Sequence, residues 1–148
     1  MSDHLEGGCL CGGIRYEITG EPFDVFHCHC SICRRASAGA YVTWVGVAAA
    51  DARITQGTLK SHASSDDGRR GFCPTCGAQI SFSYESDPAT LYFTAATLDN
   101  ADAVTPTCHG FTSETVRWLH IDDGLPEHSG NPPTVDRMHS TRLNGINT

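Results

Sequence analysis

The chain has 148 residues, of which 39% are hydrophobic, a size and composition that suit one domain with a single packed core. Its formal net charge of −7 argues against nucleic acid as a partner, because the molecule as a whole repels phosphate backbones. The apolar runs are shorter than the roughly 20 residues that span a bilayer. The N-terminal residues lack the basic and apolar regions of a signal peptide. We therefore expect a soluble, cytoplasmic protein without a membrane or nucleic-acid partner.

Short segments rich in β-branched and aromatic residues, separated by Gly and Pro, predict β-strands. In chain order these segments are residues 13–19, 23–27, 40–47, 79–84 and 90–96. Alternation in the first segment places Ile14, Tyr16 and Ile18 on one face, as in an antiparallel strand with one buried side. The predicted fold class is mainly β, with antiparallel sheets stapled by metal.

Helix signals are scarce. The best is SICRRASA at residues 31–38, where Ser31 could cap a short helical turn that carries Cys33. We expect residues 1–128 to form a single domain. The polar segment 129–148 has little apolar periodicity and is expected to extend from that domain as a C-terminal tail.

Cysteine is unusually frequent, and eight cysteines without a secretion signal favour metal binding or redox chemistry over disulfides. Seven of the eight fall into three short motifs: Cys9 and Cys11; Cys28, Cys30 and Cys33; and Cys73 and Cys76. Thiolates two or three residues apart on a tight turn can supply two corners of a zinc tetrahedron. Iron–sulfur ligation remains an alternative, because spacing alone does not exclude it.

Glycine placement divides these cysteines into two sites. Glycine directly follows Cys11 and Cys76, and a knuckle turn around a metal needs that conformational freedom. The two glycine-backed pairs therefore predict a four-thiolate structural site made of Cys9, Cys11, Cys73 and Cys76. Cys33 is instead followed by a segment that predicts a helical turn, whose dipole favours a thiolate. The second site, Cys28, Cys30 and Cys33, then has three protein ligands and an exchangeable position, which is typical of catalytic zinc.

The fourth corner of this second site has several possible occupants. Cys108 could close it, which would make both centres structural, or Cys108 could be a buried small hydrophobic residue. His27, His29 and His109 are possible ligands or proton shuttles. His29 alternates with the cysteines on either side of it, so in an extended segment it points away from both sulfurs and is a poor ligand candidate.

Four of the ten basic residues lie close to a cysteine motif: Arg34, Arg35, Arg69 and Arg70. They are either solvated surface charges or an anion-binding set, because guanidinium groups bind carboxylates in a bidentate manner. Arg34, Arg35 and Arg70 are the candidates for contact with the carboxylates of a substrate.

A resemblance to a known family rests on five segments: GGCLCGGIRYEITGEP, HCHCSICRRASAGAYVTWVGV, GRRGFCPTCGAQISF, LYFTAATLDN and RWLHIDDGLPEH. Together they resemble the glutathione-dependent formaldehyde-activating enzyme family, which includes the centromere protein V group. The likeness covers about residues 5–128 and keeps the order and spacing of all seven clustered cysteines. Cys108 is not part of the family motif.

The resemblance implies an Mss4-like, mainly β fold with two zinc ions per chain, a structural one at the four-cysteine set and a catalytic one at the three-cysteine set. It also implies condensation of formaldehyde with glutathione, formally a carbon–sulfur lyase reaction. The implied partners are a small-molecule thiol and an aldehyde, or their adduct. Two other functions fit the same cysteines: a zinc-stapled protein-binding module without chemistry, and a thiol-based metal or redox sensor.

Overall fold

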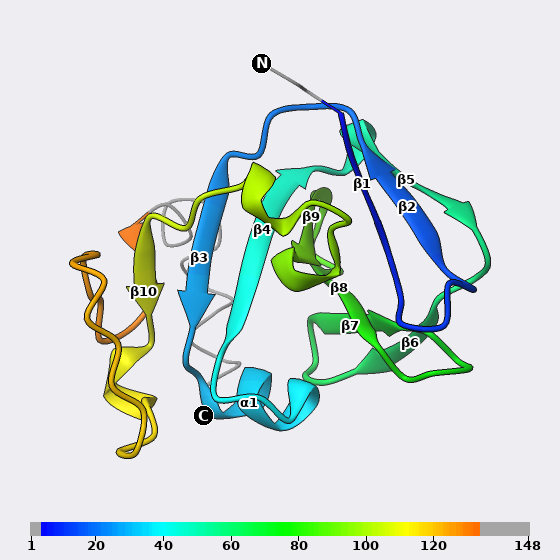
Figure 1. Ribbon diagram of the computed structural model, residues 1–148. Helices are drawn as coiled ribbons and strands as arrows, with labels where there is room; N and C mark the ends of the chain where they lie inside the picture. The colour runs from blue at the N-terminus through cyan, green and yellow to red at the C-terminus, as the bar shows by residue number, and fades with distance from the viewer. Residues whose placement is uncertain (1–3, 134–148) are drawn as a thin grey trace.

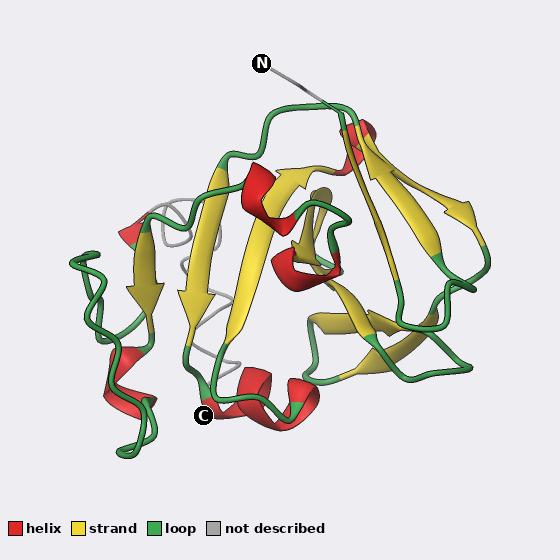
Figure 2. Cartoon of the chain, in the orientation of Figure 1, coloured by secondary structure: helices red, strands yellow, loops and turns green. Residues whose placement is uncertain are grey.

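The structure, a computed structural model, describes residues 4–133. In this part of the chain ten strands form two sheets, with one short α-helix between β3 and β4 (Figures 1 and 2). Every strand pair within the sheets is antiparallel except β10 with β3, which is parallel. The expectation of a mainly β fold is confirmed.

The smaller sheet has the strand order β1-β2-β5. Its strands are β1 (Leu5–Gly8), β2 (Arg15–Ile18) and β5 (Ala52–Gln56). Ile14, Tyr16 and Ile18 are all buried, which confirms the face predicted from their alternation. β1 and β5 were not predicted, because LEGG and ARITQ carry too few buried apolar residues to give a strand signal.

The larger sheet has the strand order β10-β3-β4-β9-β8-β7-β6. Its strands are β3 (Asp24–Cys28), β4 (Val42–Ala48), β6 (Lys60–Ala63), β7 (Gly68–Phe72), β8 (Gln79–Tyr84), β9 (Asp87–Thr94) and β10 (Cys108–Gly110). Short 3₁₀ turns lie at Ala49–Asp51, Ala95–Thr97, Ala101–Ala103 and Thr112–Glu114. The segments predicted as strands correspond to β2, β3, β4, β8 and β9, whereas β6, β7 and β10 are polar, basic or very short and were missed.

Helix α1 (Ser31–Ser37) begins at the residue that was predicted to cap it, so the observed cap lies one residue earlier. The N-cap is Cys30 and not Ser31: the backbone of Cys30 is extended, and its Sγ accepts a hydrogen bond from the Cys33 N–H at 3.3 Å. The N–H of Ser31 donates instead to the Glu114 carboxylate at 3.0 Å. The Cys30 sulfur therefore accepts the capping hydrogen bond that a hydroxyl or carboxylate oxygen usually accepts at a helix N-terminus.

Tyr16 of β2 joins the two sheets. The rings of Tyr16 and Phe93 stack with centroids 4.3 Å apart, and the Tyr16 hydroxyl lies 2.8 Å from Thr97 Oγ1. Gly7 of β1 forms an isolated antiparallel bridge with Leu98, next to these contacts. Aromatic burial with a satisfied hydroxyl thus fixes the smaller sheet over β9 and the turn that follows it.

The start of the predicted tail contacts β10. The N–H of Phe111 donates to the Gly130 carbonyl at 2.8 Å, and Pro132 is buried against Gly110. Residues 134–148 lie outside the described residues. The predicted domain boundary at residue 128 therefore stays a prediction.

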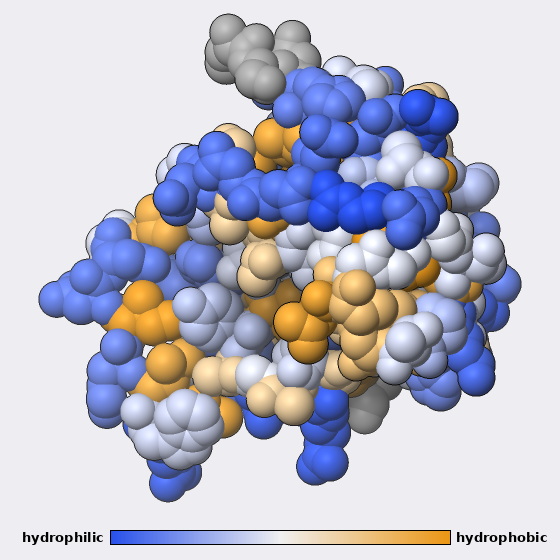
Figure 3. Space-filling view, turned by 45° about the vertical axis from the view of Figure 1, so that its right-hand side comes forward, coloured by the Kyte–Doolittle hydropathy of each residue, from blue (hydrophilic) through white to orange (hydrophobic). Residues whose placement is uncertain are grey.

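Hydrophilic side chains cover most of the face seen in Figure 3, with apolar residues gathered in its middle. Among residues 4–133, no helix has both the length and the hydropathy that a membrane crossing requires.

Gly7 provides a test of how the sheets are joined. A Cβ atom at Gly7 would lie 2.6 Å from the Thr97 carbonyl oxygen and would also collide with the Tyr16 hydroxyl. We expect Gly7→Ala to lower the free energy of unfolding by about 1–3 kcal/mol, the usual cost of overpacking. Denaturant unfolding of the metal-loaded protein measures this change. Gly130→Ala is the matched control, since nothing lies within 4 Å of its added Cβ, and equal stability of the two variants would contradict the prediction.

Candidate metal centres

Two turns, one from each sheet, bring four sulfur atoms together. Cys9 and Cys11 lie in the turn between β1 and β2, and Cys73 and Cys76 lie in the turn between β7 and β8 (Figure 1). The four Sγ atoms all lie within 4.8 Å of one another, with Cys11 Sγ 3.6 Å from Cys9 Sγ and 3.7 Å from Cys73 Sγ. This cluster could hold a metal ion, and it would tie the smaller sheet to the larger one.

Backbone N–H groups in both turns point at the sulfurs. The Ile14 N–H donates to Cys9 Sγ at 3.2 Å, and the Cys76 N–H donates to Cys73 Sγ at 3.4 Å. Gly12 and Gly77, which follow the second cysteine of each turn, have φ angles of 80° and 79°. Both glycines adopt the left-handed conformation that the knuckle interpretation requires.

The same contacts favour a thiolate at one corner of the four-sulfur cluster. Burial opposes ionisation of Cys9, but the Ile14 N–H and the neighbouring thiols lower its pKa to about 6. Because a metal binds the thiolate and not the thiol, the turn prepares a ligand near neutral pH.

The second centre lies where β3 ends and α1 begins. Cys28 is the last residue of β3, Cys30 caps the helix and Cys33 lies in its first turn; all three are buried. Their Sγ atoms lie within 4.8 Å of one another, so this cluster could hold a second metal ion. The change from strand to helix explains the spacing C-x-C-x-x-C. Residues 28 and 30 lie two apart in extended backbone, residues 30 and 33 lie three apart across the first helical turn, and the chain bends so that all three sulfurs meet.

Arg70 enters this centre from β7, a strand that the sequence did not predict. Its side chain is buried, its Nη2 donates to Cys33 Sγ at 3.7 Å, and its guanidinium lies 4.9 Å from the centroid of the Phe82 ring. Hydrogen bonds from the Cys28 and Cys30 thiols, together with the charge of Arg70, hold the pKa of Cys33 well below its usual range. A buried guanidinium thus offsets the negative charge that thiolates introduce into the core.

Among residues 4–133, no other Cys, His, Asp or Glu atom joins the three sulfurs within 4.8 Å. Cys108 belongs to the same hydrophobic cluster, but on β10 it pairs with Phe26, two residues from the level of Cys28. Burial raises the pKa of Cys108, as expected for a thiol used as a small hydrophobic side chain. Cys108 therefore does not complete the three-sulfur cluster.

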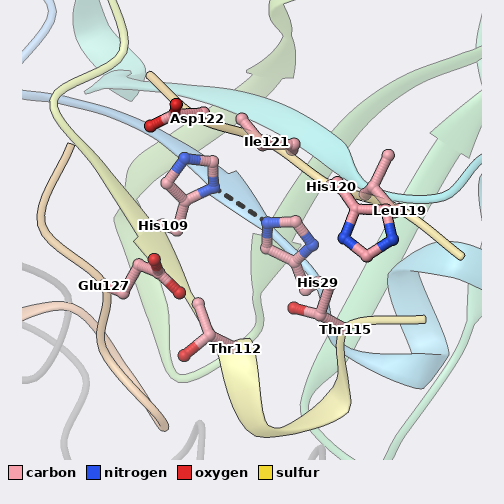
Figure 4. Close-up of a pocket in the computed structure, with 9 residues that line it drawn as sticks. All are labelled: His29, His109, Thr112, Thr115, Leu119, His120, Ile121, Asp122 and Glu127. Carbon is pink, nitrogen blue, oxygen red and sulfur yellow. Dashed lines mark hydrogen bonds between the residues drawn. The ribbon is translucent and has the colours of Figure 1, made fainter. Parts of the chain in front are cut away.

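The three histidines that were weighed as ligands lie on the other side of β3. His29 Nε2 is 2.9 Å from His109 Nδ1, and His109 Nε2 is 2.8 Å from Asp123 Oδ2. His29 thus points away from the flanking sulfurs, in agreement with its alternation along the strand. Figure 4 shows the His29 and His109 rings facing each other in a cavity of about 270 Å³ that is also lined by His120, Asp122 and Glu127.

The remaining candidates, Arg34 and Arg35, lie on α1 and line a shallow cavity of about 280 Å³ together with Val116 and Trp118. Trp118 is 72% exposed. Sequence reasoning singled out neither Trp118 nor Asp123. Their segment, RWLHIDDGLPEH, contributes to the family resemblance as a whole but has no metal-ligand or catalytic spacing, and it reaches these positions only by folding back beside β10.

These features define a class of protein: a small, mainly β protein with a four-cysteine cluster between its sheets and a separate, buried three-cysteine cluster. The family model described as glutathione-dependent formaldehyde-activating enzyme matches residues 4–114, a range that contains all seven clustered cysteines. The chain belongs to this family.

A curated relative carries the same family name, and a solved structure has a similar fold. A Halomonas elongata protein named "Putative glutathione-dependent formaldehyde-activating enzyme" is 29% identical over 86 residues, which are 51% of this chain and 54% of that protein. The chain therefore matches only about half the length of this relative. A crystal structure of a Rhodobacter sphaeroides protein gives a TM-score of 0.56 at 24% identity and covers 83% of this chain and 98% of that one. This likeness supports the fold alone.

The contact between Arg70 and Cys33 predicts how metal retention depends on pH. Removal of the positive charge in Arg70→Met raises the pKa of Cys33, so protons compete better with the metal for the thiolate. We expect the pH of half-release from the three-cysteine centre to rise by about one unit, measured by elemental analysis after dialysis across a pH series.

Arg69→Met is the control for this experiment, since the guanidinium of Arg69 contacts Glu85 at 2.8 Å instead of a sulfur. A midpoint that is the same in both variants and in the unmodified protein would show that Arg70 does not favour the Cys33 thiolate.

Proposed function

We propose that the protein is a zinc-dependent enzyme of the carbon–sulfur lyase type, which condenses an aldehyde such as formaldehyde with a glutathione-like thiol. The observation that carries this proposal is the three-sulfur cluster, for which the described residues provide no fourth protein ligand. Three protein ligands and one exchangeable position are typical of catalytic zinc, whereas structural zinc has four protein ligands.

The donor sets of both clusters fit zinc. Zinc prefers thiolates in a tetrahedral arrangement, and the four-sulfur cluster supplies such a set from two knuckle turns. We therefore propose a structural zinc held by Cys9, Cys11, Cys73 and Cys76 and a catalytic zinc held by Cys28, Cys30 and Cys33, two ions per chain. Metal analysis distinguishes zinc from iron, the other metal that cysteine clusters of this spacing bind.

The residues around the three-sulfur cluster have separable roles in such a reaction. Bound there, zinc would supply an electrophilic centre that lowers the pKa of a thiol or polarises a carbonyl oxygen. The burial of the three cysteines keeps bulk water away from the reacting groups. Arg70 offsets the thiolate charge, and its Nε and Nη1 have no hydrogen-bond partner among the described residues, so they are available to an oxygen atom of a substrate.

Two hollows beside α1 suit a small peptide thiol. A cavity of about 560 Å³ runs along Ala36 and Ser37 to the turn of Cys76, within the roughly 300–1,000 Å³ of small-molecule sites. The cavity of Arg34 and Arg35 adjoins it, because both are lined by Gly39. We propose that these two arginines, with Arg70, contact the carboxylates of the thiol substrate.

The alternatives predict different properties. A redox sensor would react at the thiolates of the three-sulfur cluster, so oxidation of Cys28, Cys30 or Cys33 by peroxide would favour that function. A zinc-stapled binding module would hold both metals and show no turnover. None of the eight cysteines is in a disulfide, which is consistent with a reducing compartment, and we propose the cytoplasm.

Cys30→Ser tests the enzymatic function. We expect this variant to keep its fold and one zinc, because the four-sulfur cluster is intact, and to lose turnover of formaldehyde with glutathione by a factor of about 100 or more, as for loss of a catalytic group. Metal analysis, circular dichroism and a coupled assay for the adduct measure the three properties.

Cys108→Ala is the control for Cys30→Ser, because Cys108 is a buried cysteine outside both clusters. It should keep both zinc ions and full turnover. Full loading of the unmodified protein with zinc and no turnover with any aldehyde and thiol pair would favour the binding module.

Arg34→Ala tests the proposed carboxylate contact. The Nε of Arg34 is buried without a hydrogen-bond partner among the described residues, so a carboxylate would satisfy it. We expect Arg34→Ala to weaken glutathione binding about tenfold, the usual worth of a charge-assisted hydrogen bond, as measured by calorimetric titration. Unchanged affinity would remove Arg34 from the site.

A further inference from the structure

The outer face of the larger sheet, opposite the three-cysteine cluster, carries a second group of potential metal ligands. β10 runs parallel to β3, and His109 is paired in register with His27. Paired residues on neighbouring strands project to the same side of a sheet. The two imidazole rings accordingly lie side by side, with centroids 4.7 Å apart.

A carboxylate from a distant segment completes this group. The backbone of Pro126 and His128 pairs with His109 as an additional edge of the sheet. The loop before this edge brings Asp123 to His109 Nε2, at 2.8 Å. One potential ligand atom each from His27, His109 and Asp123 lies within 4.8 Å of the other two.

We propose that His27, His109 and Asp123 bind a divalent transition metal ion, with zinc as the expected ion, at a third centre that is independent of the cysteine clusters. Two imidazoles and one carboxylate are a common donor set for such ions. His27 is half-buried and Asp123 is exposed, so the remaining coordination positions face water.

The contacts behind each ligand support this assignment. His27 Nδ1 lies 2.7 Å from Thr43 Oγ1, which leaves His27 Nε2 for the proposed ion. His109 Nδ1 lies 2.9 Å from His29 Nε2, and His109 Nε2 shares a hydrogen bond with Asp123 Oδ2 at 2.8 Å, so these two atoms would bind the ion in place of the proton between them. Asp123 Oδ1 accepts a hydrogen bond from the Leu125 N–H at 3.1 Å, so Oδ2 is the carboxylate oxygen that would bind the proposed ion. Metal-binding side chains characteristically have their second polar atom held in this way, which fixes their orientation.

The surrounding charge also favours a cation. Asp122 and Glu127 line the cavity that contains His109, and Figure 4 shows both on the His109 side of that cavity. The chain as a whole carries a net charge of −7.

The experiment uses the full chain with both cysteine clusters loaded with zinc and free metal removed. Calorimetric titration with Zn²⁺ should then show one additional equivalent. Asp123→Asn and His27→Gln should weaken this binding at least tenfold while both retain the two original zinc ions. Titration with Co²⁺ gives an independent signature: the additional equivalent should absorb without intense sulfur-to-cobalt charge transfer, because no thiolate takes part.

Two control variants make the result specific. Asp122→Asn removes a neighbouring carboxylate that is not in the ligand group, so it should keep the additional equivalent and weaken its binding far less than Asp123→Asn does. His4→Gln removes an exposed imidazole that lies 3.9 Å from Glu6 and 3.8 Å from Glu17, the alternative place for an adventitious ion. The proposal is overturned if no additional equivalent binds, if Asp123→Asn and His27→Gln bind it with unchanged affinity, or if His4→Gln abolishes it. These outcomes leave the turnover assay, and thus the proposed function, unaffected.

Discussion

Thiolates gathered in a protein interior repel one another and are poorly solvated, so they need a compensating positive charge. In this protein that constraint applies twice. Four sulfurs join the turns of two sheets, and three more lie at the start of α1 within the hydrophobic core. Backbone N–H groups point at the first cluster, and Arg70 points at the second. The arrangement of strands around both clusters serves to bring these compensating groups into place.

The alternation of side chains along β3 separates two environments. Cys28 lies on the inner face, where it meets the hydrophobic cluster, and His27 lies on the outer face beside His109. His29 continues the outer face beyond the end of the strand, and Cys30 turns inward to cap the helix. These four residues thus contribute Cys28 and Cys30 to the three-sulfur cluster on one face of the sheet, and His27 and His29 to the proposed His27–His109–Asp123 site on the other.

The difference between the two cysteine clusters follows from their local backbone. Glycines with positive φ close the knuckle turns of the four-sulfur cluster, and the matching position after Cys33 is instead inside a helix. The backbone N–H groups of a knuckle turn point at its sulfurs, so such turns suit a metal site with four protein ligands. A helix start leaves one side of its sulfurs toward other elements, and Arg70 lies there. The cavities proposed for the substrate lie farther along α1, toward its C-terminal end.

Several properties of this protein follow from local features of the sequence, because these features act over only a few residues. Cysteine spacing and the glycines that follow two of the motifs gave the partition of the cysteines. Apolar alternation gave the stronger strands and the mainly β class, and the combined motifs gave the family. Local features could not determine the cap at Cys30, where a sulfur replaced the expected hydroxyl of Ser31. Nor could they place Arg70 beside Cys33 or His109 beside His27. Those contacts span 37 residues or more and depend on strand order and register. Such long-range pairing is decided by the tertiary structure, since short polar strands such as β7 and β10 form only when neighbouring strands satisfy their backbone hydrogen bonds.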